Sequence, residues 1–507
     1  MNISGLSELH RASLILLFAL LAILGSRCMF HCILTRRKKF RLPPGPLGLP
    51  LVGNLPFLGP KLHHRFDEYS RAYGPIVKLK LGSKLWIVIS SPEIAKQVYK
   101  DNDIIFSNHD QPIAARVISY EGSNLVRSPY GPKWRMLRRV FLHELLNNKN
   151  LDSFSTRRQE EVDRMVRELY TKRSSPINVG EQAFAAFLNL LTSMLWGGTL
   201  EWEGNGAGFR QVVIEAVELL GRPNVSDFIP MLAWFDLQRI EREIKKRVLW
   251  LDKLYDSIID ERMKLVAVGE KNCSQDFLSI LLKIKEDAKI PLTMTNLKGL
   301  IMDIMVGGTS VTSSTVEWVM AELMHRPEIK QKAQEELEKV VGQNHTVNES
   351  HIPKLHYLRA VIKESLRHHA VVPLLVPRVP SQTCVVGGYL IPEGARVVTN
   401  VWAIHMNPEF WENPSEFQPE RFLNAKSIRE FSFFPFGSGR RRCAGLPLVE
   451  RMLPLVVATL LHAFEWRLPE GVEFDLCERP GVTLTKARPV LAIPTPRIDI
   501  SKLHNNC

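Results

Sequence analysis

The stretch "FSFFPFGSGRRRCAG", residues 431 to 445, surrounds one cysteine with positive charge and with flexible backbone. Three arginines directly precede Cys443, and glycines occupy positions 437, 439 and 445. Positive charge and the N-terminal end of a helix both lower the pKa of a thiol, so they favour the thiolate. The apolar run "LPLVERMLPLVVATLLHAF", which starts at residue 446, is typical of a long helix. The sequence therefore predicts a loop that holds the Cys443 sulfur at the positive end of that helix, with glycine backbone able to approach a flat ligand.

The composition allows a large globular protein and argues against several other classes. The chain has 507 residues, 45% of them hydrophobic and 23% charged, and a formal net charge of +13. We find no internal repeat, and the seven cysteines form neither a CxxC pair nor a cluster with histidines at zinc-binding spacing. The lack of a disulfide framework indicates a reducing compartment. Because no zinc-finger or RNA-binding motif is found, a nucleic-acid partner is not expected.

The N-terminal region is predicted to attach the chain to a membrane. Residues 14–24, "LILLFALLAIL", form an apolar block that the following residues could extend to a span of about 20 residues. The basic cluster at 36–41 would hold the next part of the chain in the cytosol, and a cleaved signal peptide is the alternative. We expect an anchor helix within 1–35, a stiff basic and proline-rich hinge over 36–50, and one large domain over 51–507.

The rest of the chain is predicted to be mainly α-helical with small β-sheets. Helical periodicity is found at 157–171, 239–266, 293–323 and 327–341. Alternating apolar residues predict two strands with a Gly-Ser turn within 76–91, and a hairpin that turns at Gly387-Gly388 within 384–401. The segment "SDFIPMLAWFDL", 226–237, is either part of the core or a second membrane contact.

The cysteine loop resembles the haem-ligand signature of the cytochrome P450 family, F-x-x-G-x-R-x-C-x-G. Every fixed position matches, namely Phe436, Gly439, Arg441, Cys443 and Gly445. The resemblance implies the cytochrome P450 fold, a single haem domain behind an N-terminal anchor, and haem b with Cys443 as the axial ligand of the iron. It also implies a monooxygenase that uses O2 and electrons from NADPH, delivered by cytochrome P450 reductase, with cytochrome b5 as a second candidate partner.

Two further motifs resemble those of the family and follow the same order along the chain. Glu364 and Arg367, in "KESLRHH", are similar to its E-x-x-R pair, and a spacing of three places both side chains on one helix face. Arg421, in "PERF", resembles the third member of this network. The implied role of the network is structural, because it would hold the loop that carries Cys443.

Several basic residues are implied to contact the haem. Trp134 and Arg138, in "PKWRMLRR", resemble the family's W-x-x-x-R helix, which implies that they reach a haem propionate. Arg378 and Arg441 are the other propionate candidates, because buried carboxylates need cationic partners. The remaining arginines near these motifs would form an outer basic surface that docks an acidic reductase: Arg135, Arg139, Arg440 and Arg442.

The central helix departs from the family pattern where protons are handled. The family usually has A/G-G-x-D/E-T-T/S, whereas residues 307–312 of this chain read "GGTSVT". Ser310 therefore stands at the acid and Val311 at the threonine, and valine can neither donate a proton nor position water. The turn consists of Gly308, Thr309, Ser310, Val311 and Thr312, and its glycines would allow a local bulge.

This departure leaves three readings open. In the first, Ser310, Thr309 or water sustains ordinary monooxygenation at lower coupling. In the second, the substrate's own hydroxyl completes the proton relay. In the third reading the haem carries out a rearrangement, dehydration or oxidative coupling with little need of the relay. A non-enzymatic haem protein for sensing or electron transfer is a further alternative, against which the spacious Gly307-Gly308 turn argues.

The predicted substrate pocket has an aliphatic wall. By resemblance the wall includes Val371, Val372, Leu374, Leu375 and Val482, although each could instead pack the core. An aliphatic wall favours a hydrocarbon-rich substrate such as a terpenoid, and a phenolic or oxime substrate stays open.

The resemblance covers essentially the whole chain and is greatest to the plant microsomal, A-type class of the family. Within this class, segments such as "LKGLIMDIMVGGT" and "IPTPR" are similar to those of sesquiterpene oxidases such as cadinene hydroxylase. The resemblance implies a single-pass protein of the endoplasmic reticulum membrane, with its catalytic domain facing the cytosol, that acts in plant specialised metabolism.

Overall fold

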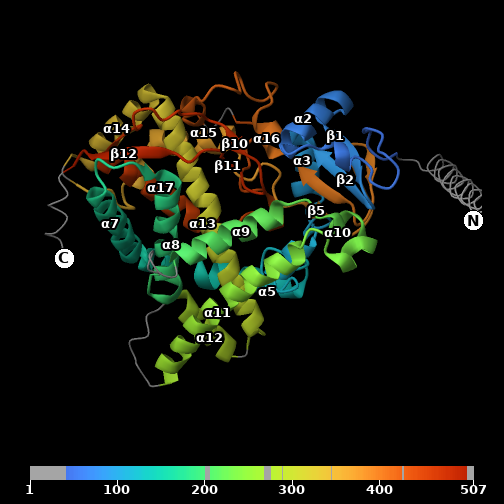
Figure 1. Cartoon of the computed structure of the whole chain (residues 1–507), viewed down its shortest axis with the longest axis horizontal. Coiled ribbons are helices and arrows are strands. Elements are labelled where there is room, and N and C mark those ends of the chain that lie inside the picture. The colour runs from blue at the N-terminus through green and yellow to red at the C-terminus, as the bar shows by residue number, and fades with distance from the viewer. Residues whose placement is uncertain are drawn as a thin grey trace, which may run out of the picture.

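The computed structural model of the chain describes residues 41–199, 206–267, 276–287, 289–343, 345–424 and 428–498. The predicted anchor within 1–35 lies outside these residues, as does the basic start of the hinge. The described part of the chain is mostly helical with small β-sheets, which confirms the predicted fold class (Figure 1).

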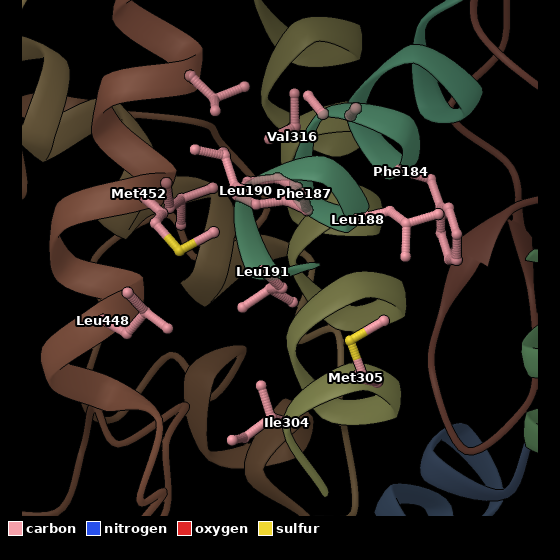
Figure 2. Packing of buried hydrophobic residues seen from close by; sticks show 14 of the residues in the cluster. Phe184, Phe187, Leu188, Leu190, Leu191, Ile304, Met305, Val316, Leu448 and Met452 are labelled. Carbon is pink, nitrogen blue, oxygen red and sulfur yellow. The ribbon is translucent and has the colours of Figure 1, made fainter. Parts of the chain in front are cut away.

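Helix α13, Met294–His325, runs through the middle of the molecule and is buried over most of its length. Its start is well defined because Thr293 and Asn296 form a reciprocal capping box. Three long helices pack against it, namely α8 (Val179–Trp196), α15 (His356–His368) and α17 (Leu446–Ala463). Figure 2 shows apolar side chains of α8, α13 and α17 in this core, among them Leu191, Met305 and Met452. Close packing on several sides holds α13 in one position.

The other helices surround this core. They are α2 (Leu62–Tyr73), α3 (Pro92–Lys96), α4 (Ile113–Ile118), α5 (Pro132–Arg139), α6 (Asn148–Ser153), α7 (Ser155–Thr171), α9 (Ala207–Gly221), α10 (Val225–Phe228), α11 (Ile240–Ala267), α12 (Phe277–Glu286), α14 (Pro327–Val341) and α16 (Val401–His405). Short 3-10 or π segments are η1 (Leu55–Phe57), η2 (Gln97–Asp101), η3 (Val140–Leu145), η5 (Pro230–Phe235), η6 (Ile352–Lys354), η7 (Pro419–Phe422) and η9 (Gly439–Arg441). The four predicted long helices correspond to α7, α11, α13 and α14, so helical periodicity located them correctly.

A sheet of five strands in the described residues has the order β1-β2-β8-β5-β3. Its strands are β1 (Ile76–Leu81), β2 (Lys84–Ile89), β3 (Asn108–His109), β5 (Arg378–Val379) and β8 (Arg396–Thr399). The antiparallel pair β1 and β2 turns at Gly82-Ser83, as predicted. At the other edge, β3 pairs with β5 so that His109 lies opposite Arg378. This edge therefore brings two basic side chains of the site together.

The remaining strands form small sheets at the periphery. The predicted hairpin consists of β6 (Cys384–Val386) and β7 (Tyr389–Ile391), and both turn glycines have positive φ, 58° for Gly387 and 79° for Gly388. The other strands are β4 (Ile177–Asn178), β9 (Phe464–Arg467), β10 (Glu478–Arg479), β11 (Thr485–Lys486) and β12 (Leu491–Pro496). The pair β10 and β11 supports the turn that contains the predicted pocket residue Val482.

Among the described residues, α17 alone is long and apolar enough to cross a membrane. However, 78% of its apolar window is buried inside the protein. The apolar composition of α17 is therefore explained by its place in the core beside α13.

Candidate active site

The loop of Cys443 is held by a tight backbone turn before α17. The Cys443 N–H donates to the Phe436 carbonyl at 3.0 Å, and Gly445 is the N-cap residue of α17. Gly439 has a φ of 69°, and a Cβ at this position would lie 2.3 Å from Asp103 Oδ1. Gly439 is therefore needed for the close approach of its backbone to Asp103. The prediction that Cys443 precedes the positive end of the helix is confirmed.

The Cys443 thiol is enclosed by protein and yet accessible to solvent. Burial raises the pKa of the thiol, while backbone N–H groups of Gly445 and Leu446 and the charge of Arg138 oppose that rise. Both properties are expected for a side chain that faces an open space inside the protein. A metal ion at the sulfur would favour the thiolate, so the residue suits a metal ligand better than a free nucleophile.

The predicted structural network is present beneath the loop. Arg367 Nε and Nη2 donate to the two Glu364 oxygens at 2.7 Å each, and both side chains are fully buried. Arg367 also donates to the carbonyls of His405, Pro414 and Glu416. Arg421 Nε lies 3.5 Å from Glu364 Oε1. The pair therefore ties α15 to the chain segment that leads into the cysteine loop.

A cluster of cations lies on one side of the cysteine loop. Arg378 is 3% exposed and donates to the carbonyls of Phe106 and Ser438. Arg441 donates to backbone carbonyls, and burial together with the charges of Arg378, Arg138 and Arg127 lowers its pKa to about 9. Trp134 contributes a buried indole Nε1 without an acceptor among the described residues, and the Arg441 guanidinium lies 4.5 Å from its ring.

This cluster fits an anionic ligand. Buried guanidinium groups that face one another are costly unless negative charge compensates them, and the orphaned Trp134 N–H needs an acceptor. Two haem propionates would supply both. Arg138 belongs to the same group of residues, since its guanidinium lies 5.5 Å from the Trp134 ring and donates to the Arg442 carbonyl.

His109 is a member of the cluster that the sequence analysis missed. Its Nδ1 donates to the Pro377 carbonyl at 2.9 Å. Burial, followed by the charges of Arg378, Arg441 and Arg127, holds the pKa of His109 well below its usual value. No local spacing in the sequence indicates that His109 belongs to this cluster, because only the pairing of β3 with β5 places it beside Arg378.

The two central glycines of α13 face different surroundings. A Cβ on Gly307 would meet no atom within 4 Å, whereas one on Gly308 would lie 2.7 Å from Leu191 Cδ1. Gly307 is exposed, Ser310 and Val311 are half-buried, and the neighbouring Met305 is buried. The side of α13 that carries Gly307, Ser310 and Val311 therefore borders open space, while Gly308 packs against α8.

The hydroxyl groups of the turn are mostly engaged by the helix itself. Thr309 Oγ1 donates to the Met305 carbonyl at 2.7 Å, and Thr312 Oγ1 donates to the carbonyls of Gly308 and Thr309. Both threonines are buried, and α13 continues through this turn without the bulge that the glycines would allow. Ser310 is therefore the hydroxyl of this turn that lies on the accessible side.

The predicted pocket residues are brought together only in part. The Leu484 N–H donates to the Val371 carbonyl at 2.8 Å, which places the segment 371–375 beside the turn that carries Val482. Val371 is buried and Val372 half-buried, while Val482 is 42% exposed and would contact a side chain at Gly221. Leu374 and Leu375 pack against two clusters of the five-stranded sheet. Leu374 and Leu375 therefore pack largely in the core, which is the alternative to a place in the pocket wall.

A groove of about 1130 Å³ lies along the loop 431–439, α15 and α17. It contains neither Cys443 nor any residue of α13, so it is not the substrate pocket. Arg442, Lys100 and Lys363 line it together with several acidic side chains. Arg135, Arg139, Arg440 and Arg442 are exposed, in agreement with the predicted outer basic surface. Arg440 also forms an ion pair with Asp103 at 2.7 Å.

The arrangement of a cysteine loop beside a buried cation cluster defines a haem-thiolate type of site. The profile of the cytochrome P450 family matches residues 43–493. The chain therefore belongs to the cytochrome P450 family. It is an oxidoreductase of the monooxygenase type, with haem as cofactor and NADPH-derived electrons that reach it through a reductase.

The most similar relatives reported are plant enzymes. A flavonoid 3'-monooxygenase of Crocosmia x crocosmiiflora is 39% identical and aligns over 90% of this chain and 93% of its own length. A 3,9-dihydroxypterocarpan 6A-monooxygenase of Glycine max is 37% identical over 95% and 98%. Among solved structures, a zebra fish cytochrome P450 with progesterone is 26% identical, with a TM-score of 0.75 over 86% and 99%. These relatives do not add support to the finer resemblance to sesquiterpene oxidases.

Proposed function

We propose that this cytochrome P450 hydroxylates a ring-containing hydrophobic molecule of plant specialised metabolism, with flavonoid-type phenolics as the first class and terpenoids as the second. The observation that carries the proposal is the Cys443 loop beside buried Arg378 and half-buried Arg441 and Arg138, whose charges repel one another. The names of the plant relatives favour the phenolic class. The aliphatic side chains of Val371 and Val372 favour the terpenoid class.

In this proposal the residues around the loop hold and orient the haem. Cys443 would bind its iron, and Arg378, Arg441, Arg138 and the Trp134 N–H would bind its propionates. When bound, a thiolate-ligated haem supplies the oxidising chemistry. The signature residues Phe436, Gly439 and Gly445 shape the loop, and the Glu364–Arg367–Arg421 network keeps it in place.

Ser310 is the residue to which we assign proton handling at the accessible side of α13. Its Oγ can hold a water molecule toward the open space beside Gly307, a task that Val311 cannot share. Thr309 and Thr312 are poorly suited, because their hydroxyls already donate to helix carbonyls. Val311 also favours the second candidate function, a rearrangement, dehydration or oxidative coupling, or a substrate whose own hydroxyl completes the relay.

Membrane attachment through residues 1–35, a hinge over 36–50 and a cytosolic catalytic domain over 51–507 remain part of the proposal. Two exposed apolar segments support it. At the end of the hinge, Leu47 is 97% exposed and Leu51 80% exposed. In η5, within the segment 226–237, Met231 is 89% and Trp234 92% exposed.

These two apolar segments are neighbours. Gly53 bridges to Leu81 at the end of β1, and Ser83 in the next turn donates its N–H to the Phe228 carbonyl at 2.9 Å, just before η5. In Figure 1 the hinge-proximal loop, β1, β2 and α10 lie at one end of the molecule. An apolar surface built from two segments suits contact with a membrane, here that of the endoplasmic reticulum.

The electron-transfer partner is a reductase, and we place its docking surface at the exposed arginines 135, 139 and 442 beside the cysteine loop. A basic surface would steer an acidic flavin domain toward the thiolate side of the haem. Cytochrome b5 is a second candidate for the same surface.

Turnover with isotopic oxygen tests the proposed function. The full-length chain, reductase, NADPH and 18O2 are incubated with a panel of flavonoids and terpenoids. We expect one labelled oxygen atom in the product of one class. A product without label would support the rearrangement or coupling alternative, and NADPH consumption without product from either class would reject both substrate classes.

A further inference from the structure

Asp303 is a half-buried acidic residue of α13 whose side-chain hydrogen bonds are all directed at one loop. Its Oδ1 accepts a hydrogen bond from Asn124 Nδ2 at 2.6 Å. Its Oδ2 accepts from the backbone N–H groups of Leu125 at 2.7 Å and Val126 at 3.3 Å. Burial raises the pKa of Asp303 to about 7, although these three donors pull it down. The carboxyl group thus lies against the segment 124–126, which supplies all three of these donors.

The same loop is docked tightly along the start of α13. Asn296 donates to the Ser123 carbonyl at 2.8 Å. One turn further, a Cβ on Gly299 would lie 3.1 Å from Asn124 Cα, so the helix and the loop are in close contact there. Asp303 follows after one more turn. Residues 296, 299 and 303 therefore form a continuous strip of α13 on which the loop rests.

The opposite edge of this loop holds Arg441. The carbonyls of Leu125 and Val126 accept from Arg441 Nη1 at 3.2 and 3.3 Å, and the Ser128 carbonyl accepts from Nη2. The peptide units of the loop are thus polarised from both sides, with a carboxyl group at their N–H groups and a guanidinium at their carbonyls. Hydrogen bonds arranged in this way strengthen one another.

The charges around the loop also connect Asp303 with Arg441. Burial lowers the pKa of Arg127 to about 10, and Asp110 and Asp303 are the acidic residues that oppose this shift. Arg127 in turn is one of the cations that repel Arg441. Asp303 therefore supplies negative charge to a cluster in which cations predominate.

We propose that Asp303 is a positioning residue for the haem. It acts through the backbone of residues 124–128 on Arg441, and so determines how firmly the chain retains the haem propionate that Arg441 binds. The inference rests on the proposed role of Arg441 and adds a link from the substrate side of α13 to the anchoring of the cofactor. Sequence spacing gives no sign of it, because 178 residues separate Asp303 from Leu125.

The test compares two carboxyl groups on the same helix that both accept backbone N–H groups, in the full-length, haem-loaded protein. Asp303→Asn replaces an acceptor oxygen by a donor and removes the charge. Glu317→Gln is the matched control, because Glu317 also lies on α13, where it is buried, and accepts a backbone N–H, that of Val490 at 3.0 Å, but it does not touch the loop. Haem loss is measured as transfer to excess apomyoglobin, and thermal unfolding reports the stability of each variant.

We expect Asp303→Asn to lose haem about ten-fold faster than the wild type, since a charged hydrogen-bond acceptor for two N–H groups is lost. Glu317→Gln should lose haem at the wild-type rate even where its unfolding temperature falls by a similar amount. Equal rates of haem loss for the two variants at matched stability would overturn the inference.

A double-mutant cycle then asks whether Asp303 acts through Arg441. Arg441→Lys keeps the charge but cannot bond several carbonyls at once. In that background Asp303→Asn should add little to the rate of haem loss, whereas independent, multiplying effects would contradict the proposed link. The reduced, CO-bound spectrum of the wild type separates the two proposals: without the thiolate-haem band the proposed function fails, and with it only the role of Asp303 is in question.

Discussion

The cysteine loop and the central turn of α13 differ in how closely they follow the family pattern. The loop matches every fixed position of the signature, and its backbone is bonded at the Cys443 N–H, which donates to the Phe436 carbonyl, and at the Ser438 carbonyl, which accepts from Arg378. The turn has lost both its acid and its threonine, and the side that carries Ser310 borders open space. The comparison teaches that this chain keeps every fixed residue of the signature, whereas the residues at the family's acid and threonine positions differ.

Removing the sulfur should have the largest effect. We expect Cys443→Ala to abolish the red-shifted Soret band of the reduced, CO-bound protein, because no other described thiol lies in the loop. Cys384→Ala serves as the control and should keep the band. A normal thiolate spectrum in Cys443→Ala would show that the comparison starts from the wrong ligand.

The next largest effect should be a loss of stability in acid, caused by a histidine near the cysteine loop. Burial, followed by the charge of Arg367, lowers the pKa of His405 to about 3, and its Nε2 accepts the Phe434 N–H. The unfolded chain binds this proton near its usual pKa of about 6.5, so stability falls as the pH drops from there toward 3. The slope should approach about 1.4 kcal/mol per pH unit.

Denaturant unfolding between pH 8 and pH 4.5 measures this slope. His405→Gln, which keeps an acceptor but does not titrate, should show a shallower decline over the same range. An equal slope in both proteins would assign the acid sensitivity to other groups.

The two central glycines of α13, Gly307 and Gly308, sharpen the comparison within one turn. Gly308→Ala should lower the free energy of unfolding by about 1–3 kcal/mol, because its methyl group overlaps Leu191. The better helix propensity of alanine should offset up to about 1 kcal/mol of this loss. Gly307→Ala meets no neighbour and should be neutral or stabilising, but it should change the proportions of products. Urea unfolding measures the stability of both variants, and product analysis measures the effect of Gly307→Ala on the products. Equal destabilisation of the two variants would show that Gly307 and Gly308 do not differ in their surroundings.

The smallest effect concerns proton delivery. Val311→Thr should raise the ratio of product formed to NADPH consumed by about two- to five-fold, since it restores a hydroxyl on the accessible side. Ser310→Ala should lower the same ratio. If neither variant changes the ratio, protons arrive by another route, such as the substrate's own hydroxyl.

Several features could be predicted from the sequence because they depend on short spacings. The signature around Cys443, the Glu364–Arg367 pair and the periodic helices α7, α11, α13 and α14 are of this kind. The prediction of a terpenoid substrate had less support than these features, because it depended on a few aliphatic residues. Two of them, Leu374 and Leu375, largely pack against the sheet. Aliphatic side chains serve a pocket and a core equally well, so their identity does not tell the two apart.

The sequence by itself determined the class of cofactor site, since the residues that build the cysteine loop follow one another within ten positions. Only the tertiary structure decided that His109 joins Arg378, that Asp303 supports Arg441 through a loop, and that adjacent glycines face a neighbouring helix and open space. The physical reason is distance along the chain. Local hydrogen bonds and helix periodicity are encoded by spacing, whereas contacts between remote segments exist only after the helices and strands have packed.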